Sequence, residues 1–372
     1  MNNHQEKVAF FLPSLEGGGA ERVVVNLIKE FIKREIKVEL VLASAKGPYL
    51  SELPKEVRII DLKSSRVIFS IPKLISYLRE EKPDIFISSL SHANLVSIIS
   101  KKIARSKTKL FLREDNTLSL VFYNSKSFKT KVIPFLMKIL YPYADLVIAV
   151  SSGVKDDLKK FTKLPENKIK VIYNPVITQD IFIKAKEPVD HPWFAEDCPP
   201  VILGVGRLTK EKDFPTLLKA FALVRKEIDS RLVILGEGEE RKNLEKLAKE
   251  LGIEEFLWMP GFVDNPYKYM SKASVFVLSS IYEGFGNVLV EALVLGCPVI
   301  STDCPSGPRE ILDNGKYGKL VSVRKPEDLA KAILDIIRSP KLINQAGVER
   351  AGMFEVDKIA AEYLDTIYGK KE

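Results

Sequence analysis

Short apolar runs alternate with longer amphipathic stretches over most of the chain. In the first 175 residues the apolar runs occupy 7–12, 37–43, 84–89, 109–112, 145–150 and 168–173. Helical periodicity covers 20–34, 72–81, 93–104 and 152–161. Within the runs the apolar residues are consecutive rather than alternating, which indicates strands buried on both faces and hence parallel pairing. Strands separated by helices predict βαβ units in a doubly wound sheet.

The pattern stops at Asn174-Pro175 and starts again near residue 200. The stretch 175–200 holds five prolines and no clear period, so we expect it to be a linker. The second series has apolar runs at 201–206, 231–236, 256–261, 274–280, 298–302 and 319–323, and helical stretches at 215–228, 240–251, 287–295 and 326–338. The sequence therefore predicts an α/β protein with two Rossmann-like doubly wound domains facing across a cleft, over 1–174 and 175–354. A last helix, at about 355–372, can pack back on the first domain.

Composition narrows the class of protein. Hydrophobic residues make up 46% of the 372 and charged residues 28%, which is globular usage and excludes a disordered chain. The sequence has no apolar stretch long enough to span a membrane, and its first apolar run is too short for a secretory leader. Three cysteines, an odd number, suit a reducing compartment. We therefore expect a cytoplasmic protein.

The net charge of +8 is unevenly distributed along the chain. Residues 1–175 hold 30 basic and 18 acidic residues, a balance of +12, which leaves −4 for the remainder. An anionic partner of the first half would explain this asymmetry. Nucleic acid, anionic lipid and a phosphorylated substrate all fit, and so does a lysine-rich surface that is simply solvated.

Two strand-to-helix turns offer anion-binding groups at the carboxyl ends of strands, where open α/β sheets bind ligands. The first, LPSLEGGGAERV, places three glycines before a helix, so that backbone amides can approach an anion. A flexible tight turn would look the same, and the run is not the dinucleotide fingerprint. The second, GVGRLTKEKDFP, brings Arg207 and Lys212 to a helix start marked by Pro215. Two cations there make a suitable diphosphate clamp.

A third turn, SSIYEGFGNVLVEALVLGC, carries the most specific pattern. A strand ends before Glu283, a glycine-flanked turn follows, and a helix runs from Asn287 to a glycine stop at Gly296. Glu291 lies four residues after Asn287 and therefore on the same helical face. Both glutamates could face a ligand over the helix start, where a carboxylate can accept hydrogen bonds from ribose hydroxyls. Glu291 could equally be an ordinary surface residue.

Taken in order, these runs resemble the GT-B glycosyltransferases of family 4. E-G-F-G-N-V-L-V-E matches their E-x7-E motif, and GRL…K, the YNPV junction at 173–176 and the G-F-V turn at 261–263 match as well. The opening G-G-A-E-R and the run D-C-P-S-G-P-R-E-I-L at 303–312 are similar to a bacterial branch that extends polyprenyl-diphosphate-linked glycans with hexoses or N-acetylhexosamines. The resemblance covers nearly the whole chain.

The resemblance implies a retaining transfer from a nucleotide sugar, most simply a UDP-sugar. It implies that Arg207 and Lys212 bind the donor diphosphate, that Glu283 lies near the transferred sugar, and that Glu291 binds the ribose. Backbone amides at the start of the helix after Glu283 would meet the distal phosphate, and the residues after Gly261 would contact the base. The remaining donor-site positions are Gly18 and Gly19, which would close over the diphosphate, together with Phe262, Val263, Gly286, Asn287, Val288 and Leu289.

One departure from the family concerns a histidine. Many members carry one after the strand that here reads LFLREDN, where Asp115 and its neighbours stand instead. His92, after the preceding strand, could point into the same cleft, and we include it among the candidate catalytic residues with Glu283, Arg207 and Lys212. The chain contains no D-x-D pair, the usual Mg²⁺-diphosphate anchor of the other glycosyltransferase fold. We therefore expect a metal-independent reaction with no cofactor beyond the donor, in which the cationic clamp and helix start stabilise the leaving diphosphate.

The acceptor side is indicated by the segment 122–143. It mixes Lys126, Lys129, Lys131 and Lys138 with large apolar residues, as a basic amphipathic helix on an anionic membrane would, although a core-facing helix with a solvated edge fits too. We expect a lipid-linked or free glycan acceptor and an enzyme peripheral to the inner face of the cell membrane. The alternatives are a nucleotide-sugar epimerase of the same fold and a non-catalytic sugar- or nucleotide-binding protein. Nucleic-acid binding is not expected, because no recognised module occurs in the basic half.

Overall fold

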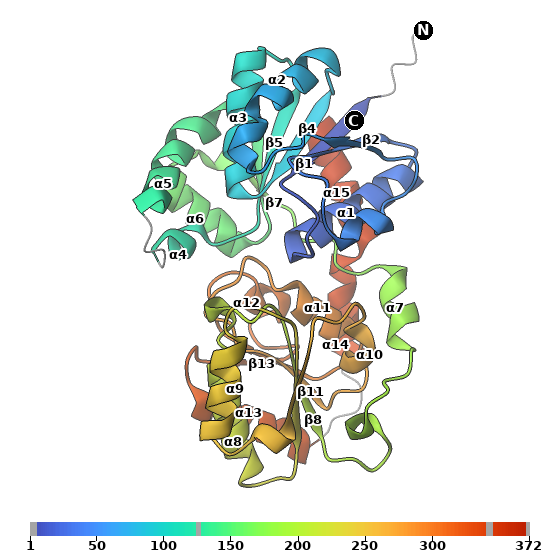
Figure 1. The fold of residues 1–372 in the computed structure, drawn as a ribbon, viewed down its shortest axis with the longest axis vertical. Helices are drawn as coiled ribbons and strands as arrows, with labels where there is room; N and C mark the ends of the chain where they lie inside the picture. The colour runs from blue at the N-terminus through green and yellow to red at the C-terminus, as the bar shows by residue number, and fades with distance from the viewer. Residues whose placement is uncertain (1–5, 124–127, 340–344, 370–372) are drawn as a thin grey trace. The chain divides into compact units, whose positions relative to one another are not determined.

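The computed structural model describes residues 6–123, 128–339 and 345–369. The chain divides into two compact units, of which unit 1 comprises Met1–Val176 with Val356–Glu372 and unit 2 comprises Ile177–Glu355. Each unit is built on one parallel β-sheet with helices packed on it (Figure 1). The α/β class with two doubly wound sheets, predicted from the alternation of apolar runs and helical stretches, is confirmed.

The sheet of unit 1 has seven parallel strands in the order β3-β2-β1-β4-β5-β6-β7. The strands are β1 Lys7–Leu12, β2 Lys37–Leu42, β3 Arg58–Asp61, β4 Ile85–Ser89, β5 Lys109–Glu114, β6 Leu146–Ala149 and β7 Ile169–Val171. Strand β3 has no counterpart among the predicted apolar runs. It lies at the edge of the sheet and its residues are mostly exposed, so it lacks the continuous apolar run of a buried strand.

Seven α-helices accompany this sheet in the described part of unit 1. They are α1 Gly19–Lys33, α2 Ile71–Glu80, α3 Ser91–Ala104, α4 Leu118–Tyr123, α5 Phe128–Leu140, α6 Ser152–Thr162 and α15 Val356–Tyr368. Helix α15, the last helix of the chain, lies beside α1, the first one (Figure 1). Buried Ile359 and Tyr363 of α15 belong to the same apolar core as Phe31 of α1 and the inner residues of β1 and β2. The last helix therefore completes the core of unit 1.

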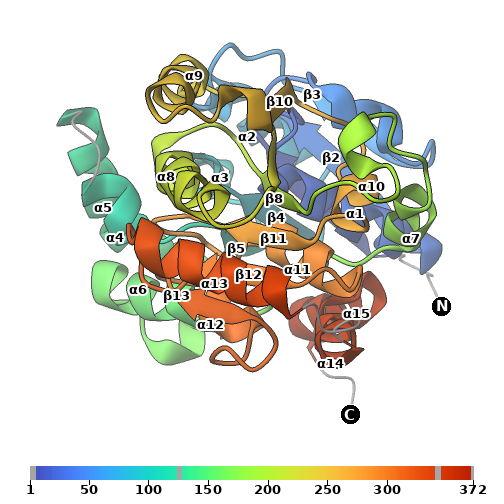
Figure 2. The same cartoon turned by 90° about the horizontal axis from the view of Figure 1, so that it is seen from below.

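The sheet of unit 2 has six parallel strands in the order β10-β9-β8-β11-β12-β13. Its strands are β8 Val201–Val205, β9 Arg231–Leu235, β10 Leu257–Gly261, β11 Val275–Leu278, β12 Val299–Thr302 and β13 Lys319–Val321. The helices are α7 Gln179–Ala185, α8 Phe214–Arg225, α9 Arg241–Glu250, α10 Tyr267–Met270, α11 Asn287–Val294, α12 Pro308–Ile311, α13 Pro326–Arg338 and α14 Gln345–Ala351. Helices α8 and α13 pack together on one face of the sheet (Figure 2). They bury an apolar core made mainly of leucine, isoleucine, valine, alanine and phenylalanine.

The proline-rich stretch 175–200 is more ordered than a linker, and the sequence-based expectation is wrong there. Helix α7 forms within it and packs against α10. The His191 ring stacks on Trp258 of β10, with 3.8 Å between the ring centroids. Five prolines interrupt the hydrophobic periodicity that would have predicted a helix here. Aromatic residues of the segment hold it against the sheet of unit 2.

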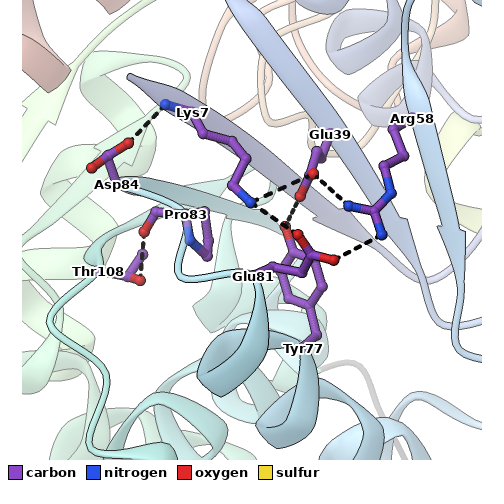
Figure 3. A network of polar contacts seen from close by, with 8 residues as sticks. All are labelled: Lys7, Glu39, Arg58, Tyr77, Glu81, Pro83, Asp84 and Thr108. Carbon is purple, nitrogen blue, oxygen red and sulfur yellow. Dashed lines mark hydrogen bonds and ion pairs between the residues drawn. The ribbon is translucent and has the colours of Figure 1, made fainter. Parts of the chain in front are cut away.

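A polar network ties helix α2 to the amino end of the sheet of unit 1 (Figure 3). The buried carboxylate of Glu39 on β2 accepts a hydrogen bond from Tyr77 Oη at 2.6 Å and lies 3.1 Å from Arg58 Nη1. Glu81 at the end of α2 bridges Arg58 Nη2 at 2.7 Å and Lys7 Nζ at 3.1 Å. These cations hold the pKa of Glu81 down, to about 2. The network lies at the end of the strands opposite to the candidate turns, so its function is to hold α2 on the sheet.

Candidate functional site

The candidate site of unit 2 is built on two adjacent strands. Because β8 and β11 pair directly and run parallel, the turns that leave their carboxyl ends lie next to each other. Two hydrogen bonds connect the turns. Ser279 donates its hydroxyl to the carbonyl of Lys212 at 2.7 Å, and the amide of Ile281 donates to the carbonyl of Glu211 at 2.7 Å. The second and third sequence motifs thus form one continuous surface.

Lys212 and Glu283 form the central ion pair of this surface. Lys212 Nζ lies 2.6 Å from Glu283 Oε1, and the two side chains are only 18% and 10% exposed. The hydroxyl of Ser280 donates to the same carboxylate oxygen at 2.6 Å. A largely desolvated pair held from two turns has a defined position, so Lys212 presents a fixed positive charge beside a fixed carboxylate.

Arg207 follows β8 and projects into solvent. Its side chain is 75% exposed, and its nearest carboxylate oxygen, on Glu211, lies 3.9 Å away. The structure therefore brings Arg207 to the same turn as Lys212 but gives the guanidinium no rigid position. An exposed arginine next to a fixed lysine can close on a ligand phosphate without first breaking a buried contact.

The backbone of the glycine-flanked turn after Glu283 depends on a close approach by a second loop. A Cβ atom on Gly307 would lie 1.9 Å from the carbonyl oxygen of Phe285, and Gly307 has a φ of +97°. The amide of Glu283 also donates to the carbonyl of Pro305 at 3.2 Å. Only glycine fits at Gly307, which explains part of the run D-C-P-S-G-P noted in the sequence. The loop at 303–307 supports the turn that carries Glu283.

Helix α11 begins directly after this turn. Gly286 has a φ of +103°, a conformation that favours glycine, and Asn287 is the first helical residue. Asn287 and Val288 are half-buried, and the amide of Leu289 already donates to Gly286 at 2.9 Å. Glu291, one turn further on, is buried with 9% of its surface exposed. Glu291 is therefore not an ordinary surface glutamate.

The other two predicted donor-site groups lie on separate turns. Phe262 follows the end of β10 and is 57% exposed, with Val263 half-buried beside it. In unit 1, Gly18 and Gly19 begin α1, and the amides of Gly17 and Gly18 both donate to the side chain of Glu21, at 2.8 Å for Gly17. The glycine-rich turn thus binds a carboxylate of its own helix where an external anion was expected.

The carboxyl edge of the sheet of unit 1 contains a buried cluster that the sequence does not predict. Arg113 of β5 is completely buried and pairs with Asp115. It also donates to Asn174 Oδ1 at 2.7 Å and to the hydroxyl of Tyr363 on α15 at 3.2 Å. Burial raises the pKa of Asp115, against the opposing effect of Arg113. Asp115, which follows the strand after which the family resemblance led us to look for a histidine, is the counter-ion of a buried arginine.

His92 and Glu114 lie at the same edge. His92 is exposed in the first turn of α3, and desolvation by its surroundings lowers the pKa of the imidazole. Glu114, the last residue of β5, is fully buried, and burial raises the pKa of its carboxyl to about 7. Sequence reasoning did not select Glu114 or Arg113, because their partners come from distant segments. The only local signal is that charged residues end an otherwise apolar strand.

Comparison with protein families supports the motif-based resemblance. Residues 17–180 match the model described as Glycosyltransferase Family 4, and residues 187–349 match the one described as Glycosyl transferases group 1. A relative from Campylobacter jejuni is 33% identical over 98% of this chain and 100% of its own length. It is N-acetylgalactosamine-N,N'-diacetylbacillosaminyl-diphospho-undecaprenol 4-alpha-N-acetylgalactosaminyltransferase. A second transferase from the same organism, which adds N-acetylgalactosamine to a related lipid-linked glycan, is 29% identical over 97% of this chain and 98% of its own length.

Solved structures share the fold over nearly the whole chain. Anabaena HepE in complex with UDP-glucose has a TM-score of 0.80 at 21% identity, over 97% of this chain and 99% of its own. The lipopolysaccharide outer core galactosyltransferase WaaB has a TM-score of 0.73 at 24% identity, over 98% of this chain and 99% of its own. With matches to both family models and a full-length relative at 33% identity, the chain is a glycosyltransferase and belongs to family 4, with the GT-B fold.

Proposed function

We propose that this glycosyltransferase moves a hexose or N-acetylhexosamine from a UDP-sugar to a polyprenyl-diphosphate-linked glycan, with retention of anomeric configuration. The observation that carries the proposal is the full-length similarity to an enzyme whose name specifies such an acceptor, together with the fixed Lys212–Glu283 pair. The two Campylobacter relatives and WaaB are all named as sugar transferases. An epimerase or a non-catalytic binding protein is therefore not favoured.

The donor side of the reaction is assigned to unit 2. Lys212 has a fixed charge and Arg207 a mobile one, so the two together can hold a diphosphate and stabilise the charge that develops on it as the sugar leaves. The start of α11 adds oriented backbone dipoles. Glu283, held by Lys212 and Ser280, would contact the transferred sugar, and buried Glu291 would accept from the ribose hydroxyls. Phe262, being exposed, is available to stack on the base.

The assigned groups supply positive charge from side chains and from a helix start, so the proposed reaction is independent of metal ions. Turnover should therefore persist in EDTA. If EDTA abolished turnover and Mg²⁺ restored it, the proposed use of Lys212 and Arg207 as the sole diphosphate clamp would be wrong. The anomeric proton of the product, observed by NMR, would test retention in the same samples.

The acceptor and the membrane are assigned to unit 1. The exposed side chains of α5 and the turn after it include Val132, Phe135, Ile139, Lys138 and Tyr143. Lys126 and the side chains of Lys129 and Lys131 lie outside the described residues. An apolar helix edge next to lysine is suited to an anionic membrane surface, where each lysine contributes about 1 kcal/mol. Among the described residues, none of the helices combines the length and apolar character needed to cross a membrane.

Membrane docking can be tested separately from catalysis. We expect the wild-type protein to sediment with vesicles that contain anionic lipid, and less so at high salt, because salt screens the attraction. A Lys126/Lys129/Lys131/Lys138→Gln variant should bind several-fold more weakly. A matched variant with four exposed lysines of unit 2 changed, Lys242/Lys246/Lys249/Lys272→Gln, should bind as the wild type does. Equal binding by the first variant and the wild type would remove 122–143 from the membrane contact.

The transfer itself is tested with a panel of UDP-, GDP- and ADP-sugars and a polyprenyl-diphosphate-linked glycan. We expect sugar from a UDP donor to appear on the lipid-linked acceptor, and no transfer from GDP or ADP donors. Transfer to free glycan only, with none to the lipid-linked form, would contradict the acceptor class. Release of a sugar epimer with no acceptor would instead favour an epimerase.

A further inference from the structure

Glu114 is a buried carboxyl whose side-chain hydrogen bonds all come from neutral donors. Its Oε1 accepts from the hydroxyl of Tyr141 and from Asn94 Nδ2, the latter at 2.8 Å. Its Oε2 accepts from the hydroxyl of Ser91 at 3.0 Å. Asn94 and Ser91 belong to the first turns of α3, and Tyr141 lies in the 3₁₀ turn Tyr141–Tyr143. The carboxyl therefore joins the end of β5 to the start of α3.

A glutamine would satisfy the same three partners. Its amide oxygen would accept from Tyr141 and Asn94, and its amide nitrogen would donate to the oxygen of Ser91. A protonated Glu114 would do the same with its O–H. Burial penalises only the ionised form and raises the pKa of this carboxyl to about 7, so the ionised form lowers stability at neutral pH. Glu114 is a buried carboxyl whose three contacts a neutral isostere could also make, and it lies at the edge of the sheet where open α/β folds bind ligands, so its ionisation is a candidate for use.

Ionisation of Glu114 changes which group donates the proton in its hydrogen bond with Ser91. When the carboxyl is charged, Ser91 must direct its proton inward to Oε2. When the carboxyl is protonated, it can donate to Ser91, whose own proton is then free to turn away. Ser91 is half-buried and directly precedes His92, which is exposed. The residue before them, Leu90, is held in an uncommon conformation with a φ of +78°, as strained residues at functional sites are.

We propose that Glu114 is a positioning residue on the acceptor side of the transferase, which sets the hydrogen bond of Ser91 and thereby the placement of His92 as it gains and loses a proton. The proposal rests on the proposed function, because it takes His92 to face the acceptor. The ionised form, which holds Ser91 and Asn94 as donors at once, is the competent one. Acceptor use should therefore decline as Glu114 becomes protonated.

The groups around Glu114 are few and can be varied one at a time. On its own strand, Arg113 and Asp115 pair with each other, and the Asp115 charge raises the pKa of Glu114. From α3 it faces Ser91 and Asn94, and from the 3₁₀ turn it faces Tyr141. The hydrogen bond from Tyr141 lowers the pKa of Glu114, so removing it in Tyr141→Phe should move the midpoint to higher pH. His92 has its own lowered pKa, and its titration should not move in that variant.

The first experiment follows the His92 ring by NMR as a function of pH, without any substrate. The chain has three histidines, so the His92 signal is assigned by its loss in His92→Gln. We expect a second inflection near pH 7 in the wild type, moved upward in Tyr141→Phe and absent in Glu114→Gln. Ser88→Ala, which removes a buried hydroxyl of β4 with no hydrogen-bond partner, should leave it unchanged. Absence of the inflection in the wild type would overturn the proposal.

The second experiment measures kcat/KM for the lipid-linked acceptor at saturating donor from pH 5.5 to 8.5. The wild type should lose at least threefold between pH 8 and pH 6, with a midpoint that Tyr141→Phe shifts upward. Glu114→Gln should be flat over this range and low throughout, while KM for the donor is unchanged. An acid limb that persists in Glu114→Gln would overturn the positioning role. A wild type that transfers no sugar at any pH would instead reject the proposed function, and the proposal with it.

Discussion

Charged side chains lie at the carboxyl edges of both sheets, but their solvent exposure differs between the two units. In unit 2, Lys212 and Glu283 keep a small exposed fraction, and Arg207 extends into solvent. In unit 1, Arg113 is completely enclosed, and its partners include Asn174 and Tyr363. The same location on the same kind of sheet thus carries partly exposed cations in one unit and a fully buried cation in the other.

The difference shows that burial decides how much of a charged group's hydrogen-bonding capacity is left for a ligand. A buried charge needs all its partners from the protein, because each unmatched hydrogen bond or charge there is costly. A charge at the surface keeps part of its bonding capacity for a ligand. Arg113 is therefore engaged entirely in holding unit 1 together, whereas Arg207 in unit 2 keeps bonding capacity that we propose is used for the donor.

The same substitution in each unit would test this contrast with the largest expected effect. Arg113→Met should lower the free energy of unfolding of unit 1 by about 3–5 kcal/mol, because it leaves the buried carboxylate of Asp115 without its counter-ion. Lys212→Met should lower stability by less, about 1–2 kcal/mol, because Glu283 keeps some exposure and its hydrogen bond from Ser280, while it removes most transfer activity. Chemical denaturation with separate probes in the two units measures both. Restoration of stability in Arg113→Met/Asp115→Leu would identify the unpaired charge as the cause, and a double variant as unstable as the single would refute it.

Within unit 2, two glutamates of one motif should differ in their kinetic effects. Glu283→Gln should lower kcat by about 10²- to 10³-fold, as expected of a charge that acts in the transition state. Glu291→Ala should leave kcat within a few-fold at saturating donor and raise KM for the nucleotide sugar. Steady-state kinetics with varied donor distinguish the two. Equal losses of kcat with unchanged donor KM would reject the division of roles.

A smaller effect is expected from Glu114, and it depends on pH. The folded pKa of about 7 lies above the ordinary value of 4.5, so protonated Glu114 is favoured by folding, and this stabilisation is lost as pH rises from 4.5 through 7. Glu114→Gln should therefore match the wild type at pH 4 and be more stable by about 3 kcal/mol at pH 8. Denaturant titrations at the two pH values measure the difference. A constant difference at both would show that ionisation is not its cause.

The sequence was sufficient where structure depends on local order. Continuous apolar runs predict the buried strands, and glycine and proline mark the starts of α8 and α11 within a residue or two. The neighbourhood of Lys212 and Glu283 was expected only from the family resemblance, because the adjacency of β8 and β11 depends on the strand order, which the local sequence does not predict. The exposed edge strand β3 and the helix α7 could not be predicted, since one lacks an apolar run and the other is short and lies among prolines.

The remaining features of the candidate site depend on contacts that the sequence does not show. Arg113 contacts Tyr363, 250 residues further along the chain, and nothing in the run LFLREDN indicates such a partner. The occupation of the Gly17 and Gly18 amides by Glu21 is local, yet the motif G-G-A-E-R is equally compatible with an amide pair open to an external anion. Side-chain direction, and not residue type or spacing, decides both cases.

The position of α15 has a consequence for how the protein is made. Translation delivers β1 to β7 first, but Tyr363 leaves the ribosome only after the whole of unit 2. Until then the nascent first unit lacks a hydrogen-bond partner for Arg113 and an apolar cover for α1. Unit 2 is a continuous segment and can fold while unit 1 waits for its last helix. A ribosome stalled before α15 would thus carry a finished unit 2 and an unfinished unit 1, and pulse proteolysis of such stalled chains would reveal that order.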